Sequence, residues 1–169
     1  MNEHEAASRG DLVRLEVTGL TNDPVANTPI LILSRTDGEG ILPIWIGLCE
    51  ANAIALHLES VTTPRPMTHD LVLSLLEGQG ATLEDIVINS IEDNVFRADL
   101  RIRRSDGSLW SADARPSDAV AIALRAQVPI FATGAVLDRA QLALPRDENE
   151  ALQLFLQSLD PKDLGKYEM

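Results

Sequence analysis

Residues 111–126 read SADARPSDAVAIALRA, and part of this stretch recurs earlier in the chain. Residues 118–125 read DAVAIALR and residues 50–57 read EANAIALH, so the two segments are offset by 68 residues. Both segments combine small and aliphatic side chains, which suits a helix packed against a sheet, and both begin with a carboxylate. The stretch therefore predicts that the chain contains the same helix twice.

Strand and turn signals around the two helices follow the same order. In the first half we predict strands over residues 12–17, 30–33 and 41–46, then helices over 48–59 and 69–77. In the second half we predict strands over residues 86–88, 95–103 and 109–112, then helices over 116–127 and 135–141. Asp37-Gly38 and Asp106-Gly107 provide the hairpin turns. Residues 128–132 are interpreted as an apolar link.

Each half, of about 65 residues, is too small for a robust core of its own. We therefore predict one α+β domain over residues 11–145, in which residues 11–80 and 81–145 are duplicated three-strand, two-helix units sharing one sheet. Two side-by-side αβ layers are the alternative. Residues 1–10 are expected to be a flexible N-terminus and residues 146–169 a helical tail. The tail has a helical stripe that suits packing on the core or on a partner subunit: Leu152, Phe155, Leu156 and Leu159.

The composition limits the classes of function. The 169 residues carry a formal net charge of −12, which repels nucleic acid at long range unless a cation or a basic patch intervenes. Apolar residues make up 45% of the chain and aromatic residues only 4%, so we expect an aliphatic core. The single cysteine, Cys49, rules out an intramolecular disulfide and favours a reducing compartment. With no apolar leader and no apolar run of membrane length, we expect a cytoplasmic protein.

The carboxylates at the front of the two helices have two interpretations. Glu50 and Asp118 would each lie in a first helical turn, where an acid meets the positive end of the helix dipole and contributes about 0.3–1 kcal/mol. Alternatively, they bind a divalent cation or polarise a water molecule, because Mg²⁺ prefers carboxylate oxygens. The spacing leaves both interpretations open.

Polar residues are unusually dense just before the second copy of the helix. Four of them fall within six positions: Asp113, Arg115, Ser117 and Asp118. Turns between strands and helices often form ligand sites, and arginine binds phosphate through paired hydrogen bonds. The structural alternative is an ion pair of Arg115 with Asp113 or with Glu50. At the repeat offset Asp113 and Arg115 correspond to Trp45 and Gly47. The two halves therefore differ at the positions where we expect ligand binding or catalysis.

Residues 64–70 read PRPMTHD. The flanking prolines favour an extended backbone around Arg65, which is a good way to present a side chain. Thr68 is the predicted N-cap of the following helix, and Asp70 is an acid in its first turn. His69 is interpreted either as an acid, base or ligand near neutral pH or as a surface or capping residue.

The densest basic segment is residues 101–104, which read RIRR. Arg101 and Arg103 would share one face of a strand, where they either meet phosphates or form the solvated face of the sheet. The chain has no glycine-rich phosphate loop, no paired CxxC, no HExxH and no GxSxG motif.

Four motifs, taken with their order and spacing, resemble the bifunctional nuclease domain family. They are LPIWIG at residues 42–47, EA at 50–51, PRPMTHD at 64–70 and DARPSDA at 113–119. The resemblance runs from about Leu12 to Leu144. It implies an α+β fold in which the duplicated units form one barrel-like sheet with helices packed against it. It also implies a homodimer or higher oligomer and cleavage of both RNA and DNA.

We therefore interpret the chain as a nuclease that hydrolyses phosphodiester bonds with the help of Mg²⁺ or Mn²⁺, which would also offset the negative charge. The candidate catalytic residues are Glu50, His69, Asp113 and Asp118, and the candidate metal ligands are Glu50, Asp113 and Asp118. The candidate substrate-binding residues are Arg65, Arg115 and Ser117. The alternative is a non-enzymatic dimeric regulatory or scaffold module that binds a small ligand or a protein.

Overall fold

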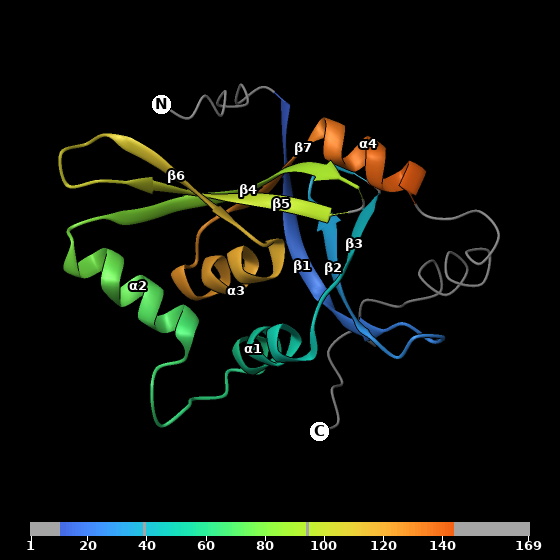
Figure 1. Cartoon of the computed structure of the whole chain (residues 1–169), viewed down its shortest axis with the longest axis horizontal. Coiled ribbons are helices and arrows are strands. Elements are labelled where there is room, and N and C mark those ends of the chain that lie inside the picture. The colour runs from blue at the N-terminus through green and yellow to red at the C-terminus, as the bar shows by residue number, and fades with distance from the viewer. Residues whose placement is uncertain (1–10, 39, 94, 144–169) are drawn as a thin grey trace.

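One twisted sheet organises the computed structural model, which describes residues 11–38, 40–93 and 95–143 (Figure 1). In chain order the strands are β1 (Leu12–Asn22), β2 (Pro29–Arg35), β3 (Ile41–Trp45), β4 (Thr82–Glu92), β5 (Val95–Arg103), β6 (Leu109–Ala114) and β7 (Ile130–Thr133). Across the sheet their order is β3-β2-β1-β7-β4-β5-β6. The α+β class with a single sheet is therefore confirmed.

The prediction of an apolar link over residues 128–132 is wrong, because β7 lies at the centre of the sheet. β7 pairs antiparallel with β1, where Leu12 faces Thr133, and parallel with β4, where Ile86 faces Ile130. Ile130 and Ala132 are buried at 5% and 0% exposure. A short apolar run without alternation is typical of a fully buried strand, but hydrophobic periodicity cannot identify it.

The sheet is open, so the barrel-like closure expected from the family resemblance is wrong. Among the described residues β3 and β6 are the two edges, and each pairs with one neighbour only. The central β7 separates the strands of the two halves and joins them into one long ribbon. Closure would require β3 and β6 to meet, and they lie at opposite ends of the order.

The repeated sequence does form two helices of equal length, α1 (Leu48–Leu58) and α3 (Pro116–Ala126). Their bounds keep the offset of 68 residues. Duplication of the whole unit stays a prediction, because β7 has no counterpart among the described strands of the first half.

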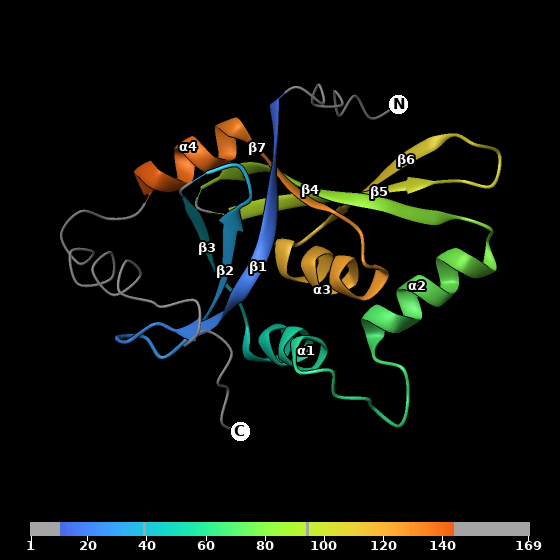
Figure 2. The ribbon, with the colours of Figure 1, turned by 180° about the vertical axis from the view of Figure 1, so that it is seen from behind.

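The helices divide between the two faces of the sheet. α1, α2 (Thr68–Gly78) and α3 lie on one face, and α4 (Gly134–Ala143) lies on the other (Figures 1 and 2). α3 contacts β4 and β5 on one side and α1 and α2 on the other. Its buried residues 119–123 read AVAIA, and these small side chains allow such close packing. Layering therefore places the starts of α1, α2 and α3 near one another.

The start of α2 differs by one residue from the prediction. Met67, rather than Thr68, is the N-cap, and the Asp70 carboxylate accepts a hydrogen bond of 2.8 Å from the Met67 backbone N–H. Asp70 is in the first turn as predicted. The predicted flexible segment over residues 1–10 and the tail helix over residues 146–169 lie outside the described residues. No helix in the described ranges is long and apolar enough to cross a bilayer.

Truncating Ile130 tests whether β7 is part of the core. We expect Ile130→Ala to lower the free energy of unfolding by about 2–5 kcal/mol, because a buried aliphatic side chain leaves a cavity when it is shortened. The matched control is Ile41→Ala on edge strand β3, where 39% of the residue is exposed. Urea denaturation of both variants measures the difference, and equal losses would contradict the central position of β7.

Candidate functional site

Arg115 connects the beginnings of α1 and α3. Its Nη1 lies 2.8 Å from Oε1 of Glu50, and its Nε donates to Oδ2 of Asp118 at 2.8 Å. Arg115 is the N-cap of α3 and has an extended backbone, as expected for a residue that precedes a proline. This geometry explains why the side chain reaches back over the first turn. The Arg115–Glu50 pair, one of the two structural alternatives from the sequence, is confirmed.

His69 adds the beginning of α2 to this arrangement. Its Nε2 lies 3.3 Å from Oδ1 of Asp118. The side chain is only 13% exposed, and its Nδ1 is buried without a hydrogen-bond partner among the described residues. We refer to Glu50, His69, Arg115 and Asp118 as the charged cluster. It joins the first turns of three helices, whose dipoles all favour negative charge at this point.

Solvent reaches the charged cluster through Arg115. The Arg115 side chain is 66% exposed, whereas Asp118 and Glu50 are 32% and 18% exposed. Gly47, directly before α1, leaves room for the Glu50 side chain to fold back, since a Cβ there would overlap the carboxylate. The cluster thus presents an exposed cation to solvent above two partly buried carboxylates.

The pKa of Asp118 lies below its ordinary value. Burial on its own would raise this pKa, but hydrogen bonds from Arg115 and His69 and their charges outweigh the burial. Asp118 is therefore a carboxylate at neutral pH and accepts protons poorly. Its environment suits the binding of a cation better than the removal of a proton from water.

Two residues of the predicted site lie outside the charged cluster. Asp113 is exposed on edge strand β6, opposite Asp99 of β5, and forms no ion pair with Arg115 in the described part of the chain. Ser117 is buried at 6% exposure and does not share the ion pairs of its neighbours. The sequence placed Asp113 and Asp118 in one motif, but the strand-to-helix turn between them directs them to different surroundings.

The predicted three-carboxylate metal site is not assembled. Within the described ranges no group of three or more His, Cys, Asp or Glu side chains is placed to hold a metal ion. Glu50 and Asp118 do offer hard oxygen donors within the span of one guanidinium group. Mg²⁺ is commonly held by one or two carboxylates together with substrate phosphates. The donor set therefore fits a two-carboxylate site in which the cation takes the place of Arg115.

Arg65 lies in a different surface feature from the charged cluster. It lines a cavity together with Asp70 and Arg125, the last residue but one of α3. Sequence reasoning missed Arg125, whose Nε donates to Oδ1 of Asp70 at 2.9 Å and whose side chain is only 8% exposed. The signal that could have found it is the end of the repeat, where EANAIALH has His57 and DAVAIALR has Arg125.

The arginines of the basic segment 101–104 are paired with other side chains of the protein. Arg101 forms a two-pronged ion pair with Asp85 of β4, and Arg103 pairs with Glu84. Arg104 lies over the ring of Trp110, 5.3 Å from its centroid. These charges are neutralised or stacked on the protein itself, so the segment is a poor phosphate-binding stripe.

Removing the Arg115 bridge is expected to raise the pKa of Asp118. Because the folded-state pKa is depressed, the carboxylate favours the folded state above its ordinary pKa, and this contribution is lost as the pH falls through the folded value. The free energy of unfolding of Arg115→Gln should therefore decrease less steeply as the pH falls.

Carboxyl ¹³C NMR titration measures the pKa of Asp118 directly. Arg97→Gln removes an equal charge from the exposed pair with Glu92 and should leave Asp118 unchanged; an Asp118 titration insensitive to Arg115→Gln would contradict the bridge.

Comparison with known proteins identifies the family to which the chain belongs. Residues 31–145 match the bifunctional nuclease domain, a range that contains α1, α2, α3 and the whole charged cluster. Two proteins of Mycobacterium tuberculosis, from strains CDC 1551 and H37Rv and both described as uncharacterized, are each 40% identical over 161 residues. That similarity covers 88% of this chain and 96% of each relative. The chain belongs to the bifunctional nuclease domain family.

Proposed function

We propose that the protein is a nuclease that hydrolyses phosphodiester bonds in RNA and DNA at the charged cluster. The observation that carries the proposal is the convergence of an exposed arginine, two half-buried carboxylates and a histidine at three helix starts. Family membership supports the same activity. Hydrolysis of a phosphodiester needs positive charge on the phosphoryl oxygens, an oriented water and a proton for the leaving oxygen, and the cluster has a side chain suited to each.

Arg115 is the proposed phosphate ligand. It is the most exposed member of the charged cluster, and its planar guanidinium matches the paired oxygens of a phosphate. The approach of a phosphate would compete with Glu50 and Asp118 for the same donors. Arg115 therefore has to leave at least one carboxylate to bind substrate, and that carboxylate then needs another cation.

Glu50 and Asp118 are the proposed ligands of Mg²⁺ or Mn²⁺, which would add charge opposite the phosphate and lower the pKa of a water molecule. The low pKa of Asp118 keeps this side chain ionised and ready for that role. His69 is the proposed proton donor to the leaving oxygen, because histidine exchanges protons near neutral pH. Its hydrogen bond to Asp118 fixes the ring in the cluster.

Asp113 and Ser117 keep only a supporting place in the proposal. Asp113 is exposed on β6 outside the charged cluster, so its proposed role is limited to contact with a part of the substrate away from the reacting phosphate. Ser117 is buried in the first turn of α3, where it is suited to holding the helix start. Neither is expected to be as sensitive to substitution as Asp118.

Nuclease activity is tested by cleavage of single-stranded RNA and of plasmid DNA by highly purified variants. We expect Asp118→Asn and His69→Gln each to lower the rate by about 100-fold or more, because each removes a group that acts on the reacting phosphate. Glu77→Gln, an exposed acid at the end of α2, is the matched control and should cleave like the wild type. Equal cleavage by wild type and Asp118→Asn would identify a contaminating nuclease and refute the proposal.

The metal is tested separately from the residues. Chelation with EDTA should abolish cleavage, and added Mg²⁺ or Mn²⁺ should restore it. Glu50→Gln should raise the concentration of Mg²⁺ needed for half-maximal activity, since it removes one of two proposed ligands. Glu77→Gln again serves as control. Full activity in EDTA would show that the charged cluster works without a divalent cation.

We also propose a homodimer. Edge strand β6 carries Leu109 and Trp110 at 57% and 44% exposure. Unpaired edge strands with apolar side chains readily pair with another chain. Light scattering after size-exclusion chromatography should give twice the chain mass, and Trp110→Lys should convert the dimer to monomer.

A further inference from the structure

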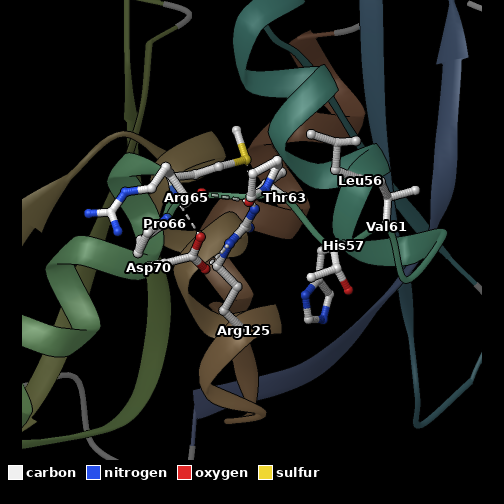
Figure 3. A pocket seen from close by; sticks show the side chains of 11 residues that line it. Leu56, His57, Val61, Thr63, Arg65, Pro66, Asp70 and Arg125 are labelled. Carbon is white, nitrogen blue, oxygen red and sulfur yellow. Dashed lines mark hydrogen bonds and ion pairs between the residues drawn. The ribbon is translucent and has the colours of Figure 1, made fainter.

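A cavity of about 330 Å³ lies between the end of α1, the loop over residues 61–67, the start of α2 and the end of α3 (Figure 3). Its size is within the range of small-ligand sites. It is distinct from the charged cluster but adjoins it, because Asp70 on its wall directly follows His69 in the chain. Nothing in the proposed cleavage step uses this cavity.

Arg125 makes one wall of the cavity rigid. Its Nε donates to Asp70 at 2.9 Å, its Nη1 to the Ala121 carbonyl at 2.8 Å and its Nη2 to the Ala53 carbonyl at 2.9 Å. These bonds tie α1, α2 and α3 to a single guanidinium. The carboxylate of Asp70 balances this buried charge. The pair therefore shapes the cavity, but Arg125 is not available to bind an anionic ligand.

Arg65 is a second cation at the cavity, and no carboxylate among the described residues balances its charge. It lies between Pro64 and Pro66, and its carbonyl accepts a 2.7 Å hydrogen bond from Thr63 Oγ1, so the loop that carries it is stiff. Its side chain is exposed and has no hydrogen bond or ion pair with any other described residue. In a chain with a net charge of −12, such an arginine on a rigid wall is suited to an anion.

His57 lies at the opposite end of the cavity from Arg65, with the Asp70–Arg125 pair between them (Figure 3). Burial and then the charge of Arg125 lower the pKa of His57, and Asp70 partly opposes them. The ring is therefore neutral at neutral pH and can donate or accept one hydrogen bond. Leu56 and Val61 add apolar surface at the His57 end (Figure 3), and the two loop prolines flank Arg65.

A cation at one end, apolar walls and a neutral imidazole at the other match the parts of a nucleotide. We propose that the cavity binds one nucleotide, with its phosphate on Arg65, its sugar beside the Asp70–Arg125 pair and its base on the apolar surface next to His57. The location beside the charged cluster makes it a subsite for the strand that the cluster cleaves, and in this respect the inference rests on the proposed nuclease function. A free mononucleotide carries the same chemistry.

Binding of adenosine monophosphate tests the site without any cleavage, because this ligand has no phosphodiester bond. The readout is the imidazole NMR signal of His57, one of three histidines in the chain, assigned with His57→Gln. We expect adenosine monophosphate to shift this signal, because the base lies next to the His57 ring in the proposed orientation. Arg65→Gln should weaken binding by about tenfold or more, since it removes hydrogen bonds to a charged group.

The matched control is Arg139→Gln, which removes an exposed arginine of α4 on the other face of the sheet and should leave binding unchanged. Displacement of adenosine monophosphate by a short oligonucleotide identifies the strand as the source of the nucleotide. Failure to displace it identifies a free mononucleotide and overturns the subsite assignment. An unchanged His57 signal at millimolar ligand, or wild-type binding by Arg65→Gln, overturns the site itself. Binding without nuclease activity would refute the proposed function and leave the site in place.

Discussion

Close packing of α3 between the sheet and the helices α1 and α2 is the constraint on which the rest of the structure depends. Residues 119–123 of α3 are at most 4% exposed, and three of the five are alanines. Larger side chains would push α1 and α2 away from the sheet, because a close-packed interior cannot absorb extra volume without moving whole elements. The alanines thus set the distance at which α1 and α2 approach α3. The polar contacts between these helices form only at that spacing.

The two arginines that flank α3 show how one helix serves two different purposes. Arg125 at its end is 8% exposed and has its hydrogen bonds fixed by three helices, so it behaves as part of the core. Arg115 at its start is 66% exposed and pairs with two carboxylates that solvent can reach. A buried, satisfied charge cannot respond to a ligand without a large cost, whereas an exposed bridge exchanges partners easily. The difference in burial, rather than in chemistry, separates a structural arginine from a binding one.

The sequence predicted the helices, the single sheet and most of the charged cluster. The repeated EANAIALH and DAVAIALR segments sufficed for α1 and α3, since apolar periodicity reports directly on which face is buried. Three features were beyond it. β7 is a short apolar run whose role depends on two distant strands. Arg125 is a core residue only because Asp70 and the Ala53 carbonyl meet it in space. Asp113 shares a motif with Asp118, but a turn separates their surroundings. The misses of β7 and Arg125 concern partners far away in the chain, which local patterns do not contain, whereas the miss of Asp113 concerns the direction of a turn.

The placement of β7 also determines when the sheet can be completed during synthesis. β1 is made first, yet one of its neighbours is β7, near the end of the described chain. β2 and β3 can form a meander with β1 early, and β4, β5 and β6 can form a second one, but no described strand joins the two meanders until residues 130–133 arrive. Pairings between distant segments form slowly because a long loop must close first. During that interval β1 and β4 each have an unpaired edge, so the nascent protein is prone to aggregate until β7 emerges.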